Sequence, residues 1–218
     1  MKPGLLGSLL LLLATDAFAH RLDEYLQAIR ISVATNRIDV SIDLTPGVAV
    51  ADQVVAAADK DQDGRVSEAE VAAYAQRVLK DIRVGLDEKA LALSLVDASF
   101  PALEDVKKGV GVIRIKTTAP VGPLAVGKHA LSLTNAHLPA ISVYLVNALT
   151  PKDRAIKITK QTRDELQKNY RLEFRMLPKV ISEKVGPTCW LATTPGWASL
   201  PFRKSLLATR ITPKCLFS

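Results

Sequence analysis

The feature that most constrains this chain is a run of twelve residues in which alternate side chains carry oxygen. Positions 1, 3, 5, 9 and 12 of the run are Asp59, Asp61, Asp63, Ser67 and Glu70. Position 6 is Gly64, which allows a sharp turn, and position 7 is Arg65, of which only the backbone carbonyl is needed. Calcium takes about six to eight oxygen ligands at roughly 2.3–2.6 Å, so a short loop can enclose it only if alternate side chains point inward. The spacing predicts a calcium-binding loop with Asp59, Asp61, Asp63, Arg65, Ser67 and Glu70 as ligands.

Helical patterns flank this loop on both sides. One helical face before it carries Ala51, Val54, Val55 and Ala58, and one after it carries Val71, Tyr74, Ala75 and Val78, with Ile82 extending the second stripe. Ser67 and Glu70 also match a capping box, so the second helix should begin inside the loop. Over residues 49–84 the chain resembles the EF-hand family, and the resemblance implies one bound Ca²⁺. An acidic turn that binds no ion is the alternative.

The rest of the chain favours strands. Residues 37–44 alternate strictly, with Ile38, Val40, Ile42 and Leu44 on one face and Asp39 and Asp43 on a solvated face. Further strands are expected at about 25–34, 91–96, 110–118, 129–134, 141–149, 155–162 and 169–174. Short strands separated by Pro, Gly and Asn turns are typical of an antiparallel sandwich. We therefore expect a mostly β domain over 20–176, antiparallel and β-sandwich-like, with the helix–loop–helix inserted between the second and third strands.

Residues 1–19 match a signal peptide. Lys2 is followed by an apolar run over 5–14, and Ala17-Phe18-Ala19 forms an A-x-A cleavage site. The segment predicts export by a signal peptide to a periplasm or to the exterior, with His20 as the new N-terminus. An uncleaved anchor is the alternative, although the run is short for a membrane span. We expect no transmembrane span in the mature chain.

The net charge of +7 is concentrated near the end of the chain. Residues 177–218 contain six basic residues and one acidic residue, so most of the excess lies there. The same segment holds five prolines and both cysteines without a regular period, which predicts a basic, Pro-rich tail that is poorly ordered or atypical. Its spacing leaves open whether Cys189 and Cys215 pair. Residues 20–176, the body of the chain, show no clustering of charge along the sequence. We therefore expect no basic patch on the body and no nucleic-acid partner.

The three histidines give no catalytic pattern. His20, once exposed by cleavage, offers an amine and an imidazole that could bind copper or nickel. The alternative is that cleavage happens to expose a histidine with no metal-binding role. His129 stands at a strand start and should be solvated, and His137 stands in a turn where a local hydrogen bond is expected. The sequence contains no G-x-S-x-G motif, no Gly-rich phosphate loop and no Cys–His pair. We therefore predict that the protein is not an enzyme.

A second resemblance concerns the N-terminal half. His20, the segments Tyr25-Leu26-Gln27-Ala28 and Arg37-Ile38-Asp39-Val40, and the acidic loop resemble the exported N-terminal domain of nickel/cobalt-type transporters. No transmembrane helices follow here, so the resemblance implies a free-standing relative and no transport role. We expect an exported calcium-binding protein that acts as an interaction module. The alternative is a periplasmic transition-metal-handling accessory that uses His20.

The partner of such a module is left open by the sequence. A single hand has no second hand to pack against, because the chain contains only one calcium loop. Its apolar helix faces should therefore be covered either by the sheet or by a second copy of the chain. The protein partner is unknown, with a membrane transporter and self-association as the two candidates.

Overall fold

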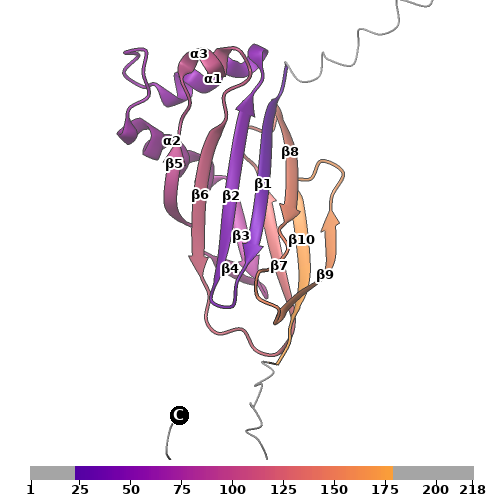
Figure 1. Ribbon diagram of the computed structural model, residues 1–218. Helices are drawn as coiled ribbons and strands as arrows, with labels where there is room; N and C mark the ends of the chain where they lie inside the picture. Colours follow the sequence, from indigo (N-terminus) through magenta and orange to yellow (C-terminus); the bar gives the residue numbers. More distant parts are fainter. Residues whose placement is uncertain (1–22, 179–218) are drawn as a thin grey trace, which may run out of the picture. The chain divides into compact units, whose positions relative to one another are not determined.

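The computed structural model describes residues 23–178, which form two five-stranded sheets packed face to face with helices at one end (Figure 1). The first sheet has the strand order β5 (Ser94–Ser99), β6 (Ile113–Pro120), β2 (Arg37–Pro46), β1 (Tyr25–Val33) and β8 (Ser142–Ala148). The second has the order β4 (Lys89–Leu91), β3 (Ile82–Leu86), β7 (Gly127–Asn135), β10 (Asn169–Met176) and β9 (Ile156–Arg163). This arrangement confirms the mostly β, sandwich-like fold with an inserted helical segment. No helix within the described residues is long and apolar enough to cross a membrane.

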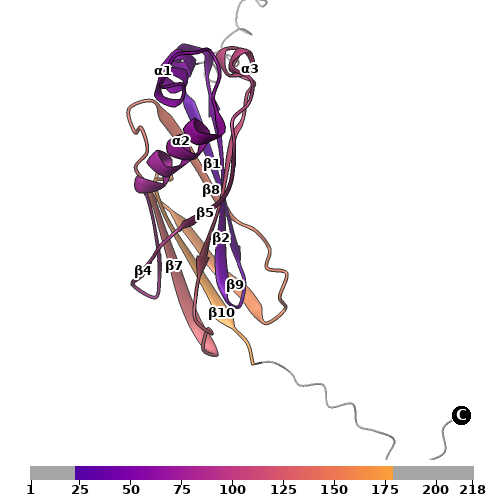
Figure 2. The same ribbon diagram turned by 90° about the vertical axis from the view of Figure 1, so that its left-hand side faces the viewer.

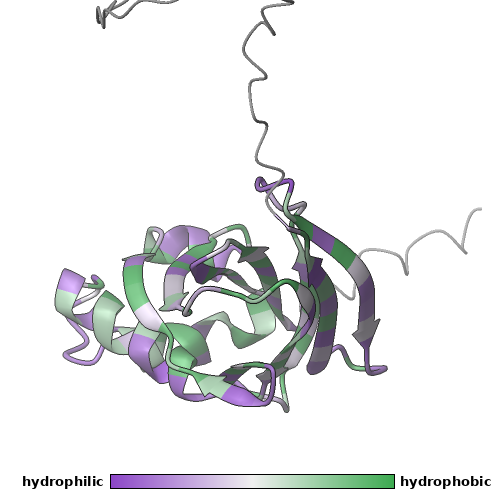
Figure 3. Cartoon of the chain, turned by 90° about the horizontal axis from the view of Figure 1, so that it is seen from below, coloured by the Kyte–Doolittle hydropathy of each residue, from purple (hydrophilic) through white to green (hydrophobic). Residues whose placement is uncertain are grey.

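The core lies between the two sheets, where strand alternation places apolar side chains. Figure 3, which views the domain along its strands, shows hydrophilic and hydrophobic bands alternating along several of them. Strand residues that are at most 1% exposed include Tyr25, Ile31, Ile38, Ile42, Leu44, Leu131, Leu133, Leu172 and Phe174. Complete burial of an aliphatic side chain stabilises a fold by about 1.5–3 kcal/mol, so these positions dominate its stability.

Strand pairing contains one feature that the alternation did not predict. β1 pairs with β2 in the antiparallel register Ile29↔Ile42, as expected of a hairpin. On its other side β1 pairs with β8 in parallel, with Tyr25 opposite Ser142. The remaining pairs in both sheets are antiparallel. β8 therefore joins the first sheet after the chain has crossed from β7 in the second.

The inserted helices are α1 (Val48–Ala58) and α2 (Glu68–Lys80), and α3 (Leu103–Lys107) lies beside α1 (Figures 1 and 2). α1 contacts α3 and β2, whereas α2 contacts β5 and β3. The buried faces of the two inserted helices consist of Val50, Ala51, Val54 and Ala58 in α1 and of Tyr74, Ala75, Val78 and Leu79 in α2. The domain itself therefore covers the apolar faces of these helices, which was one of the two arrangements that the sequence left open.

Several local expectations were wrong. Ile82 does not extend the second helix, because α2 ends at Lys80, Asp81 is its C-cap and Ile82 begins β3. The strand expected at 91–96 is divided between β4 and β5. The strand expected from residue 110 begins at Ile113, and Val110 is 66% exposed. The Asp81 cap accounts for the first difference. The second arises because β4 belongs to the second sheet and β5 to the first, so the chain crosses between the sheets after Leu91.

Candidate metal centre

The acidic loop between α1 and α2 is shaped by its own side chains. Gln62 and Gly64 have φ of 59° and 82°, in the left-handed region, which turns the chain back toward its start. Asp61 Oδ1 accepts a hydrogen bond from the Asp63 N–H at 3.2 Å, and Asp63 Oδ1 accepts one from the Arg65 N–H at 2.8 Å. Each aspartate thus bonds to the backbone two residues on, a local turn that such residues favour. These turns fold the loop into a compact arc.

The arc brings three carboxylates together. Asp59, Asp61 and Asp63 each offer one oxygen, and these oxygens all lie within 4.8 Å of one another. Asp59 is buried, whereas Asp61 and Asp63 are exposed. Like charges this close repel one another in the absence of a cation. The group is therefore a candidate cation site whose side-chain ligands would all be oxygens.

Asp59 provides a second observation that points to a ligand. Its Oδ2 accepts a hydrogen bond from the Gly64 N–H at 3.1 Å, across the loop. Its Oδ1 has no hydrogen-bond partner among the described residues, and it is shielded from solvent because only 7% of the residue is exposed. A buried carboxylate oxygen without a partner is costly, and native structures rarely tolerate one unless an ion or a water satisfies it. This oxygen is therefore available to a cation or a water inside the loop.

Glu70 holds the two ends of the loop together. One of its oxygens, Oε1, accepts a hydrogen bond from the Lys60 N–H at 2.6 Å near the start of the loop. The other, Oε2, accepts bonds from the Ser67 N–H and hydroxyl at 3.0 and 2.9 Å, and the capping box is complete. The backbone N–H of Ser67, followed by that of Lys60 and by the Ser67 hydroxyl, lowers the pKa of Glu70 to about 2. Glu70 is therefore ionised at any physiological pH and closes the loop as an anion.

The structure groups only part of the predicted ligand set. It brings Asp59, Asp61 and Asp63 together, while Ser67 and Glu70 bond to each other. The backbone of Arg65 enters the loop network through its N–H. The six-ligand set thus remains a prediction. His20 lies outside the described residues, so its proposed metal-binding role stays a prediction from sequence.

The loop is tied to the core through both helices. Arg77 Nη1 of α2 donates a hydrogen bond to the Ala57 carbonyl of α1 at 3.0 Å. The hydroxyls of Tyr74 in α2 and Tyr25 in β1 lie 2.6 Å apart, and the Tyr74 and Phe100 rings meet edge to face with centroids 6.0 Å apart. Burial raises the pKa of Tyr74 to about 12 and that of Tyr25 well above its usual value, so both stay neutral. The loop therefore rests on a rigid support.

His137 is the first of two histidines that the structure places in defined networks. Its Nδ1 lies 2.7 Å from Asp81 Oδ2, at the C-cap of α2, and only 3% of its side chain is exposed. Its backbone carbonyl accepts hydrogen bonds from Gln27 Nε2 and from the Tyr144 hydroxyl. Burial lowers the pKa of His137 despite the opposing effect of Asp81. The local hydrogen-bonding role expected for this residue agrees with these contacts.

His129 is not solvated, in contrast to the expectation from sequence. Its Nδ1 lies 2.6 Å from Asp87 Oδ2, its Nε2 lies 2.8 Å from the Ala125 carbonyl, and its ring stacks on Phe174. Since both ring nitrogens face acceptors, the protonated form satisfies both contacts. Burial lowers the pKa of His129, but the hydrogen bonds to Ala125 and Asp87 outweigh that effect and leave the pKa raised. The pairing of Asp87 with His129 joins residues 42 positions apart and was not visible in the sequence.

Comparison of the chain with protein-family models and with curated proteins finds no match. A functional interpretation therefore depends on the residues and geometry described above.

Proposed function

We propose that this protein is an exported calcium-binding module whose loop over residues 59–70 binds one Ca²⁺ as a structural ion. The observation that carries the proposal is the buried Oδ1 of Asp59, which has no partner within residues 23–178 and belongs to a residue grouped with Asp61 and Asp63. A cation bound there would neutralise the repulsion within the group and satisfy that oxygen. The export of the module is supported by the signal-like sequence of residues 1–19.

The chemistry of the cluster favours calcium over other common ions. All three grouped side chains are carboxylates, which suit hard cations, whereas zinc and copper sites in proteins usually contain His or Cys ligands. Magnesium requires near-ideal octahedral geometry at about 2.0–2.1 Å and gives up water reluctantly. A loop with several oxygens and the long side chain of Glu70 at its end suits the larger ion. Ligation by Glu70 would exchange some of its present hydrogen bonds for a bond to calcium.

The packing of the hand favours a structural ion over a switch. Sensor hands open a hydrophobic groove when calcium binds. Here Val54, Tyr74 and Val78 are already at most 2% exposed against the domain, so opening would uncover core surface. Extracellular calcium sites bind at about 10⁻⁴–10⁻³ M, which suits an ion that is constantly present. Calcium should therefore stabilise the fold without exposing new apolar surface.

Calorimetry on the loop variants tests this proposal. We expect one Ca²⁺ per chain for the wild type, no measurable binding for Asp59→Ala, and at least tenfold weaker binding for Glu70→Gln. Asp52→Asn is a matched control, because Asp52 is an exposed carboxylate of α1 outside the loop. Unchanged affinity in both loop variants would overturn the proposal. Increased binding of a hydrophobic dye on adding calcium, at unchanged melting temperature, would instead indicate a sensor.

A further inference from the structure

The outer face of the second sheet carries a row of three cations that the sequence does not reveal. Arg175 in β10 is directly opposite Lys128 in β7 and directly opposite Lys157 in β9. Directly opposed residues of antiparallel strands point to the same face, and all three residues are exposed. With strands about 4.8 Å apart, the row spans about 10 Å across the sheet. The expectation that the body of the chain would show no basic patch was therefore wrong.

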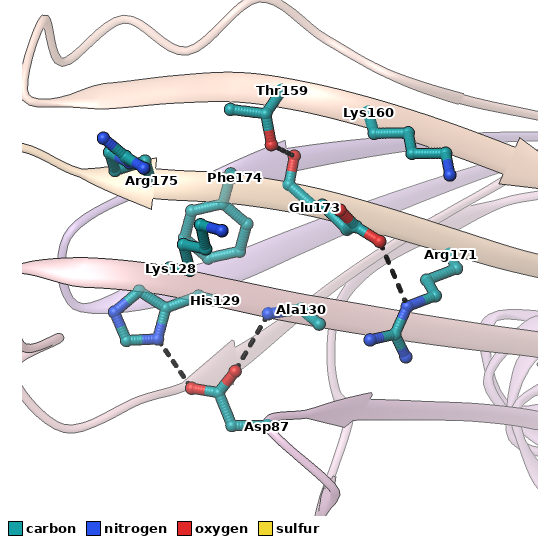
Figure 4. Close-up of a pocket in the computed structure, with 10 residues that line it drawn as sticks. All are labelled: Asp87, Lys128, His129, Ala130, Thr159, Lys160, Arg171, Glu173, Phe174 and Arg175. Carbon is teal, nitrogen blue, oxygen red and sulfur yellow. Dashed lines mark hydrogen bonds and ion pairs between the residues drawn. The ribbon is translucent and has the colours of Figure 1, made fainter.

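Within the described residues, no carboxylate pairs with this row. Like charges placed directly opposite each other destabilise a sheet. Within residues 23–178, none of the three cations forms an ion pair with a carboxylate. The acidic residue nearest along β10, Glu173, has its Oε1 3.6 Å from Arg171 Nε (Figure 4). The row thus costs stability, and no contact within the described domain offsets that cost.

A groove of about 500 Å³ lies beside two members of the row (Figure 4). Its lining includes Lys128, Lys160, Arg171 and Arg175 together with Thr159. Two acidic residues also line it, but Glu173 is paired with Arg171 and Asp87 with His129. A register shift between Glu173 and Phe174 interrupts the pairing of β10 with β9, and such a bulge locally bends and twists a strand. The groove is therefore concave and carries a net positive charge.

We propose that this groove and the row beside it bind a linear polyanion whose phosphate groups follow one another closely, as in inorganic polyphosphate. Three cations side by side over about 10 Å can contact several consecutive anionic groups, whereas one isolated phosphate would contact only part of the row. The site is independent of the calcium loop, which lies in the helices inserted between β2 and β3.

Two other polyanions fit the face less well. Proteins that bind single-stranded nucleic acid stack bases on exposed aromatic rings. Among the described residues, two aromatic rings line the groove, and neither offers an open face: Phe174 is 1% exposed, and the His129 side chain, stacked on it, is 9% exposed. An anionic bilayer would meet the rim of a concave groove and leave its interior charges unmatched. The lining therefore favours a flexible chain of phosphates without bases.

Binding of tripolyphosphate and of longer polyphosphate to the full chain tests the proposal. We expect the triple variant Lys128→Gln, Lys157→Gln and Arg175→Gln to bind the longer chain about tenfold more weakly at low salt. The matched control removes the same charge elsewhere through Lys107→Gln, Lys108→Gln and Arg114→Gln, three exposed residues outside this face. The control should change affinity less than twofold, which separates this face from the basic segment 177–218.

The thermal stability of the triple variant provides an independent measurement. Because the row costs stability, the variant should melt at or above the wild-type temperature, which also shows that it folds. Equal losses of affinity in both triple variants, or no polyphosphate binding by the wild type, would overturn the proposal. Single-stranded DNA bound as tightly as polyphosphate would also overturn it and indicate a nucleic-acid site. Binding to anionic vesicles without binding to soluble polyphosphate would overturn it in favour of a lipid surface.

Discussion

Replacing Asp59 by Asn should change stability in opposite directions with and without calcium. The substitution removes one of three clustered charges but keeps a side-chain oxygen for the Gly64 N–H. The new amide N–H₂ can donate toward the carboxylates of Asp61 and Asp63, which lie nearby. Without calcium the variant should therefore be the more stable protein. With calcium the wild type should be the more stable one, because only it retains all of the proposed ligands.

The size of both effects follows from the geometry. Two unit charges 4.8 Å apart repel by about 0.9 kcal/mol in a water-like dielectric, which is the appropriate choice because Asp61 and Asp63 are exposed. Removing Asp59 eliminates two such contacts, so we expect a gain of about 1 kcal/mol after screening by salt. Calcium at ten times its Kd stabilises the wild type by about 1.4 kcal/mol. For a domain of this size, 1 kcal/mol corresponds to a shift in melting temperature of about 2–4 °C.

Thermal melting in the presence of a chelator, and then over a series of calcium concentrations, measures the stability difference between the two proteins in both conditions. In chelator, the wild type should melt about 2–4 °C below Asp59→Asn. As the calcium concentration rises, the melting temperature of the wild type should increase more than that of the variant. Asp52→Asn should follow the wild type in both conditions, because Asp52 lies outside the loop. If Asp59→Asn melted below the wild type in chelator, the carboxylates would not be in electrostatic conflict. If both proteins gained equally from calcium, the loop would not be the site.

Three further predictions concern other parts of the domain. Ser67→Ala should lower the free energy of unfolding by about 1 kcal/mol in chemical denaturation, because it removes the N-cap of α2; an unchanged value would contradict the capping role. His129→Gln should cost about 1 kcal/mol near pH 5, with a smaller cost above pH 8. The folded-state pKa of His129 is raised, so its stabilisation is complete below the unfolded value near 6.5 and is lost as pH rises through the folded value; a deficit independent of pH would refute this. Deleting residues 179–218 should leave the melting temperature nearly unchanged, since β10 ends at Met176; an insoluble product would contradict it.

Features encoded within a short stretch of sequence were the most predictable. The strict alternation of residues 37–44 predicted β2, whose residues Ile38, Val40, Ile42 and Leu44 are fully buried. The aspartate cluster was also visible, because its three members lie within five residues and local turns bring them together. Ile82 shows the limit of such patterns. It fits the helical stripe of Val78 and the strand alternation of Val84 equally well, and the Asp81 cap decides between them.

Features that depend on strand pairing were not predictable. Alternation shows which face of a strand is buried, but not which strand lies beside it, so the parallel pairing of β1 with β8 could not be foreseen. For the same reason the cationic row was missed. Lys128, Lys157 and Arg175 are far apart in the sequence and become neighbours only through the pairing of β7, β10 and β9. A count of charges along the chain cannot detect a patch of this kind.

The contacts of α2 explain why an ion in an exposed loop should matter to the whole sandwich. At its start, Ser67 and Glu70 fix the helix to the loop, and at its end Asp81 contacts His137. In between, Tyr74 reaches Tyr25 of β1, and β3 begins one residue after the Asp81 cap. Local unfolding starts where few buried contacts hold the chain, and in this helix–loop–helix segment that is the solvent-exposed loop. Fraying of α2 from the loop would loosen the supports of both β1 and β3, so an ion bound in the loop would stabilise the junction between the inserted helices and both sheets.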